Sequence, residues 1–130
     1  MLAVDTNVLV RVLVDDAAAP EQCRNARLAV SEAGEVYVAQ VVQIETVWVL
    51  ASAYGLGKAA IQETLGVIAS HPAFSLQRPD VFQVALQLFR SGHADFADCV
   101  ILAESASAGH ELATFDRKLG KLPGTRLVSR

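Results

Sequence analysis

The sequence predicts a single α/β domain with a central, mainly parallel sheet of about five strands, flanked by helices on both faces. Short runs rich in β-branched residues alternate with longer segments of helical periodicity, and the connections between them are short. At 130 residues, with 52% hydrophobic and 19% charged residues, the chain has the size and composition of one globular core. We therefore expect one domain over residues 1–130.

The first elements are a strand, two helices and a second strand. A short apolar run predicts a buried strand at Leu2–Asp5, and Val8–Val14 follows as one or two helical turns. A proline suits the first position of a helix, so a second helix is expected over Pro20–Ala33. Gly34 would end it with a left-handed cap. The β-branched and aromatic residues of Glu35–Ala39 predict the second strand.

The middle of the chain predicts two helices and a third strand. Val41–Tyr54 is apolar on most of its circumference, so this helix should be largely buried. Two glycines at positions 55 and 57 end it, and Lys58–Ser70 forms the next helix before Pro72. Phe74–Leu76 is the expected third strand.

The last third predicts two helices and two strands. Pro79–Ser91 places its apolar residues on one helical face, and Gly92 closes it. Ala97–Ala108 is a second, nearly continuous apolar helix. Strands are expected at Leu112–Phe115 and Arg126–Val128.

Charge and cysteine content exclude several classes of protein. The formal net charge of −3 is unlike that of a strongly basic nucleic-acid-binding protein. Cys23 and Cys99 both lie in helical patterns, which favours buried thiols in a reducing cytoplasm over a disulfide framework. The first sixteen residues include Asp5 and Arg11 and lack a basic leading segment, so we expect neither a signal peptide nor a membrane span.

Four carboxylates lie within or beside segments that should bury themselves: Asp5, Glu45, Asp98 and Asp116. Carboxylates are seldom buried unless they are paired or bind a metal ion. Asp5 and Asp116 follow expected strands, whereas Glu45 and Asp98 are expected in the first turns of helices. In open parallel sheets, sites form at the carboxyl ends of the strands, so all four acids could face one crevice.

A divalent cation is the natural partner of such a cluster. Two like charges about 4 Å apart repel by roughly 4 kcal/mol at an effective dielectric constant near 20. Oxygen ligands alone suit Mg²⁺ or Mn²⁺, whereas zinc would require histidine or cysteine, and the three histidines show no metal-ligand spacing. A metal-bound water attacking a phosphodiester gives a nuclease hypothesis.

The residues that carry this chemistry also carry a family resemblance. The segments VDTNVLVRVL, QIETVWVL and DFADCVILAESASAGHELATFDRKL resemble, in order and spacing, those of PIN-domain proteins, and specifically VapC-type toxins of toxin–antitoxin pairs. This resemblance implies a Mg²⁺- or Mn²⁺-dependent endoribonuclease that cleaves RNA. It also implies a parallel sheet, inhibition by a cognate VapB-type antitoxin, and a homodimer.

The resemblance assigns roles to individual residues. Asp5, Glu45, Asp98 and Asp116 match the four acids of the family, and Asp5 and Asp98 would be the principal metal ligands. The supporting polar residues that match are Thr6, Asn7 and Thr114. Asp95, three residues before Asp98, is either an additional outer acid or the N-cap of the helix that follows.

Each candidate also has a purely structural interpretation. Asp5 could be a turn residue that bonds the backbone at Asn7, and Asp116 could pair with Arg117 or Lys118. Arg11, Arg117 and Lys118 are candidates for contacts with RNA phosphates, although a solvated rim explains the last two equally well. Trp48 is expected in the core or at an interface with a dimer partner or antitoxin.

Three other functions compete with a toxin nuclease. An aspartyl phosphatase or phosphotransferase would need a second aspartate two residues after Asp5, where this chain has Asn7. A PIN nuclease of RNA processing without a toxin role fits the same residues. A non-catalytic binding module is disfavoured because all four acids are present.

Overall fold

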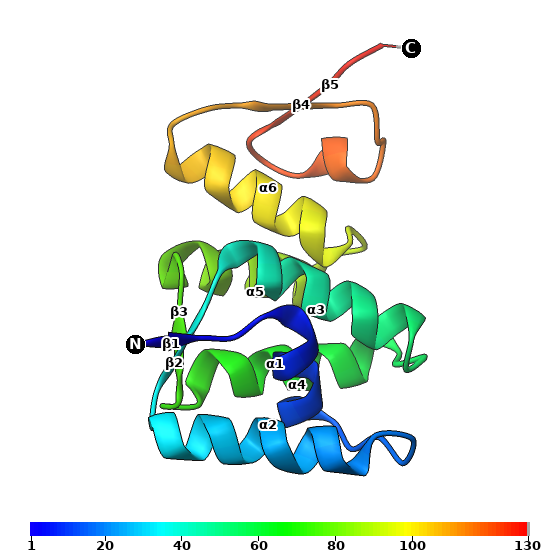
Figure 1. The fold of residues 1–130 in the computed structure, drawn as a ribbon. Coiled ribbons are helices and arrows are strands. Elements are labelled where there is room, and N and C mark those ends of the chain that lie inside the picture. Colours follow the sequence, from blue (N-terminus) through cyan, green and yellow to red (C-terminus); the bar gives the residue numbers. More distant parts are fainter. Residues whose placement is uncertain (130) are drawn as a thin grey trace. The chain divides into compact units, whose positions relative to one another are not determined.

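The computed structural model describes residues 1–129 and contains two compact units, residues 1–77 and 78–130 (Figure 1). The first unit is an α/β unit with three strands and four helices. Its elements are β1 (Leu2–Ala3), α1 (Thr6–Leu13), α2 (Pro20–Ala33), β2 (Val36–Val38), α3 (Gln40–Ser52), α4 (Lys58–Ser70) and β3 (Phe74–Leu76).

The three strands of the first unit form a parallel sheet in the order β1-β2-β3. Tyr37 pairs with Ala3 on one side and with Ser75 on the other, so β2 is the central strand. Val36 and Val38 on this strand are completely buried. Helix α1 packs against α2 and α3, and α4 packs against α3 and β3, which together enclose an aliphatic core.

The second unit contains two helices, a 3₁₀ turn and two strands. Its elements are α5 (Pro79–Ser91), α6 (Phe96–Ser107), β4 (Leu112–Thr114), η1 (Leu119–Lys121) and β5 (Thr125–Leu127). Strands β4 and β5 pair in parallel. The ring of Phe96 on α6 makes edge contacts with Phe82 and Phe89 of α5, with ring centroids 5.7 and 5.8 Å apart, and this contact forms the centre of the unit's core.

The predicted fold class is confirmed. All five expected strands are present, and the observed pairings are parallel, although they divide the strands into a sheet of three and a sheet of two. Helix α1 begins at Thr6 instead of Val8, because Asp5 caps it. The 3₁₀ turn η1 was not expected. Among residues 1–129, no helix is both long enough and apolar enough to cross a membrane.

Candidate active site

Asp5 connects the first strand to the first helix. Its backbone is extended, with φ −86° and ψ 178°, and its side-chain Oδ1 accepts a hydrogen bond from the Val8 N–H at 2.9 Å. The residue is therefore the N-cap of α1, and the expected bond to Asn7 is replaced by one to Val8. The carboxylate is exposed, so the capping bond leaves it accessible to solvent and to ligands.

A surface pocket of about 610 Å³ begins at Asp5 and extends between α1 and α2. Its α1 side carries Asn7, Val8 and Arg11, and its α2 side is formed by the stripe Gln22, Asn25, Ala26 and Ala29. The pocket therefore brings one predicted acid, one predicted supporting residue and one predicted phosphate-binding residue onto a common surface.

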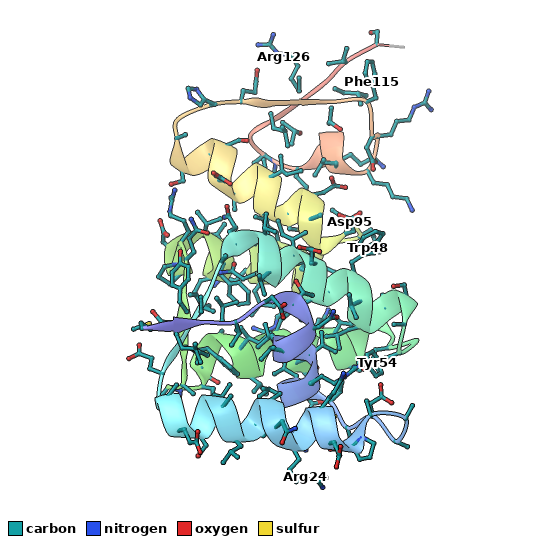
Figure 2. All side chains as sticks on the ribbon, in the orientation of Figure 1. Arg24, Trp48, Tyr54, Asp95, Phe115 and Arg126 are labelled. Atoms are coloured by element: carbon teal, nitrogen blue, oxygen red, sulfur yellow. The ribbon has the colours of Figure 1, made fainter. Side chains whose placement is uncertain are left out.

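Arg11 is held in place by three groups. Its Nε donates to Gln22 Oε1 at 3.0 Å, and its Nη1 donates to the Tyr54 hydroxyl and lies 3.4 Å from Asp16 Oδ2. The Tyr54 hydroxyl in turn donates to Asp16 Oδ2 at 2.9 Å, and this hydrogen bond is the largest cause that lowers the pKa of the Asp16 carboxyl. Arg11 is thus a fixed cation on the pocket wall (Tyr54 is labelled in Figure 2).

Glu45 lies on an exposed face of α3, between two exposed apolar residues. Val41 is 63% and Trp48 71% exposed, and both share a helical face with Glu45 because they lie four residues before it and three after it. The expectation that Trp48 packs in the core is wrong (Figure 2). The expectation that Glu45 lies in the first turn of its helix is wrong, because α3 begins at Gln40 and Glu45 is its sixth residue.

Gln43 positions the start of α3, a role that the sequence did not suggest. The side chain is 1% exposed, and its Nε2 donates to the carbonyl oxygens of Val38 at 3.1 Å and Gln77 at 2.9 Å. These carbonyls follow the ends of β2 and β3, so Gln43 ties the helix that carries Glu45 to the carboxyl edge of the sheet. A glutamine in an apolar helix was the only available signal.

Asp95 and Asp98 lie at the N-terminus of α6 in the second unit. Asp95 Oδ1 accepts a hydrogen bond from the Asp98 N–H at 2.8 Å, which makes Asp95 the N-cap of the helix (Figure 2). The capping interpretation of Asp95 is therefore confirmed. Asp98 is the third residue of α6, in its first turn as expected, and its side chain is half-buried.

Asp116 follows β4 and organises the turn after it. Its Oδ1 accepts the N–H groups of Lys118 at 2.8 Å and Leu119 at 3.2 Å, and its own N–H donates to Thr114 Oγ1 at 3.0 Å. Asp116 thus contacts Lys118 through the backbone N–H, which differs from the side-chain pairing of the structural alternative. Thr114 supports Asp116 directly, which gives the predicted hydroxyl a structural role beside the acid.

The second unit brings three of the candidate acids into electrostatic contact. Burial raises the pKa of the Asp98 carboxyl above its ordinary value of 3.8. The negative charge of Asp95, a side-chain hydrogen bond with Asp95, and the negative charge of Asp116 raise it further. A cation bound among these carboxylates would remove the repulsion between them.

The predicted basic residues of this unit are exposed. Arg117 and Lys118 both project into solvent, and Arg117 lines a surface hollow of about 310 Å³ together with Phe115, Leu127, Val128 and Ser129. Arg126 pairs with Glu111 at 2.7 Å. These residues stay candidates for contacts with a polyanion.

The donors at these positions suit a hard divalent cation. All are carboxylates, and Asp5, Asp95 and Asp116 each use Oδ1 to accept from the backbone, which fixes the carboxylate orientation. Within residues 1–129, no group of three or more His, Cys, Asp and Glu side chains is arranged to hold a metal ion. The fit to Mg²⁺ or Mn²⁺ thus rests on the carboxylate oxygens of these residues and not on their arrangement. The complete set of metal ligands stays a prediction.

The chain matches the family model described as "PIN domain" over residues 2–124, which is nearly its whole length. No curated protein matches the sequence significantly.

Proposed function

The chain belongs to the PIN domain family, and on that basis we propose that it is a divalent-metal-dependent endoribonuclease and the toxin of a toxin–antitoxin pair. Membership of this family supports a nuclease. The match over residues 2–124 is the single observation that carries the proposal. Asp5, Asp98 and Asp116 lie beside turns that side-chain to backbone hydrogen bonds hold in place. This fixed placement supports their assignment as metal-binding residues.

We assign the principal metal-binding role to Asp5 and Asp98 and a supporting catalytic role to Glu45 and Asp116. A bound Mg²⁺ or Mn²⁺ would activate water at neutral pH and neutralise charge on the phosphodiester. The capping bond of Asp5 and the turn bonds of Asp116 hold one oxygen of each carboxylate and leave the other oxygen for a ligand. Asp95 orients the first turn of α6 and thereby positions Asp98.

The toxin role rests on the VapC-type resemblance of the acidic motifs. In this role a VapB-type antitoxin would inhibit the enzyme, and a second copy would form a homodimer. The exposed apolar side chains Val41 and Trp48 on α3 offer a surface that a protein partner would cover.

Cleavage of a total RNA pool by the purified, antitoxin-free protein tests the nuclease. We expect cleavage with Mg²⁺ or Mn²⁺, none with EDTA, and none by Asp5→Asn. Asparagine caps a helix as well as aspartate does, so this variant removes the charge while keeping α1 intact. Asp15→Asn is the matched control, because Asp15 is exposed and forms a surface ion pair with Arg27. Full metal-dependent cleavage by Asp5→Asn would refute the assignment.

Expression in a bacterial host separates a toxin from a nuclease of RNA processing. We expect the wild-type chain to arrest growth, Asp5→Asn to be tolerated, and co-expression of a cognate VapB-type antitoxin to restore growth. Cleavage in vitro without growth arrest would contradict the toxin role and leave the nuclease standing.

A further inference from the structure

The pocket between α1 and α2 is hollow because its α2 wall is built from small side chains. Gln22, Asn25, Ala26 and Ala29 recur at the spacing of one helical face. The two alanines end at Cβ, so they form a shallow apolar floor opposite Val8. The volume of about 610 Å³ lies within the range typical of small-molecule sites, about 300–1,000 Å³.

The polar groups on this wall are carboxamides, which offer both hydrogen-bond donors and acceptors. Gln22 Oε1 accepts from Arg11, so its orientation is fixed. Within residues 1–129, the side-chain amides of Asn7 and Asn25 make no hydrogen bond. Carboxamides that line a pocket and lack internal partners can bond a ligand without first breaking a contact in the protein.

The charges around the pocket favour a neutral ligand over an anionic one. Arg11 is balanced by Asp16 at 3.4 Å, whereas the Asp5 carboxylate at the mouth would repel a phosphate in the absence of a cation. A neutral, planar group with donors and acceptors on its edges fits both the carboxamides and the apolar floor. A nucleobase has these properties, and proteins that read RNA hydrogen-bond unpaired bases along such edges.

We propose that this pocket binds one unpaired nucleobase of the RNA substrate and so selects the nucleotide whose phosphate is presented to Asp5. The proposal rests on the proposed nuclease function and specifies its substrate preference. Gln22, Asn25 and Asn7 read the edge of the base, Val8, Ala26 and Ala29 contact its face, and the fixed Arg11 keeps Gln22 in place.

Nuclear magnetic resonance with the four ribonucleosides as probes tests the pocket without any cleavage, because these probes carry the base but no phosphate for Asp5 to repel. The full-length protein is titrated in EDTA while the side-chain amides of Asn7 and Asn25 and the methyl group of Ala29 are followed. We expect at least one nucleoside to shift all three signals. We also expect Ala29→Leu, which fills an exposed part of the pocket, to weaken its binding about tenfold or more.

Two further variants keep the test interpretable. Asn25→Asp retains the shape of the side chain but replaces its two donors with a charged acceptor, so it should change which nucleoside binds best. Ala59→Leu makes the same substitution as Ala29→Leu at an exposed position of α4 that does not line the pocket, and it should leave binding unchanged. Equal weakening by Ala29→Leu and Ala59→Leu would overturn the proposal.

Cleavage assays with metal distinguish failure of the pocket from failure of the nuclease. If the wild type cleaves RNA and Ala29→Leu cleaves the same sites at the same rate, the pocket proposal is overturned. If nucleosides shift the pocket signals but the wild type cleaves no RNA with either metal, the base-binding pocket is supported and the nuclease fails. If only a protein partner, and no nucleoside, shifts the three signals, the pocket is a protein contact and the proposal is overturned.

Discussion

Asp95 combines a capping role with a place beside a candidate metal ligand, and two substitutions separate these roles. Loss of a capping side chain typically costs about 0.5–2 kcal/mol, whereas asparagine caps as well as aspartate. We therefore predict that Asp95→Ala lowers the free energy of unfolding by about 1 kcal/mol and that Asp95→Asn leaves it nearly unchanged. Urea unfolding measures both. Equal destabilisation would show that the charge of Asp95, and not its capping bond, supports α6.

Asp98 should make the stability of the metal-free protein depend on pH. Its pKa is raised in the folded state, so the unfolded chain loses this proton first as the pH rises. The protonated carboxyl of Asp98 contributes its full stabilisation at pH values below the ordinary pKa of an aspartate. This contribution is lost as the pH rises through the higher pKa that Asp98 has in the folded protein. We predict that Asp98→Asn is more stable than wild type at about pH 7 in EDTA, by a few tenths to about 1 kcal/mol.

The difference between wild type and Asp98→Asn should shrink at about pH 3, where the carboxyl is protonated in both states. Urea unfolding at the two pH values provides the measurement. A constant difference would mean that the substitution acts through packing instead of through ionisation.

At the scale of the element, α3 depends on one buried amide. Gln43 bonds two carbonyl oxygens at the edge of the sheet, and an unsatisfied buried polar group costs about 1–3 kcal/mol. We predict that Gln43→Met, which has a similar shape but no donor, lowers the free energy of unfolding by that amount. Gln83→Met on the exposed face of α5 is the matched control. If the two variants unfold alike, the amide contributes nothing to the stability of the edge.

Helices whose ends are marked by a proline or a glycine were predictable from the sequence. Pro20 and Gly34 mark α2 to the residue, and Pro79 marks the start of α5, because their conformational limits act within one turn. The role of Gln43 was not predictable, since its partner Gln77 lies 34 residues away and no local pattern encodes that contact. The exposure of Trp48 could not be predicted for the same reason, because burial depends on which neighbours cover a face.

The candidate site was only partly predictable on the scale of the whole molecule. The acidic positions stand out in the sequence because each lies in or beside an apolar segment, but the structure exposes the carboxylates of Asp5, Glu45 and Asp116 and half-buries that of Asp98. The capping bond of Asp95 is one of the two roles that its position three residues before Asp98 predicts. The pocket wall on α2 could not be foreseen, because Gln22, Asn25 and Ala29 look like the ordinary solvated face of a surface helix.

Binding of a divalent cation should stabilise the folded chain by mass action. A ligand at about 100 times its dissociation constant adds about 2.7 kcal/mol when it binds only the folded state. We predict that Mg²⁺ or Mn²⁺ raises the melting temperature of wild type and of Asp15→Asn, and that Asp5→Asn and Asp98→Asn lose most of this increase. Differential scanning calorimetry with and without EDTA measures it. An unchanged increase in both site variants would place the cation elsewhere.

The two cysteines offer a way to time the opening of each unit separately. Cys23 lies on α2 in the first unit at 4% exposure, and Cys99 lies on α6 in the second at 0% exposure. A thiol reagent can reach either sulfur only after the surrounding helices separate, so its rate of reaction reports local unfolding. With one cysteine replaced by alanine at a time, labelling kinetics would show whether residues 1–77 and the following unit open together or one before the other.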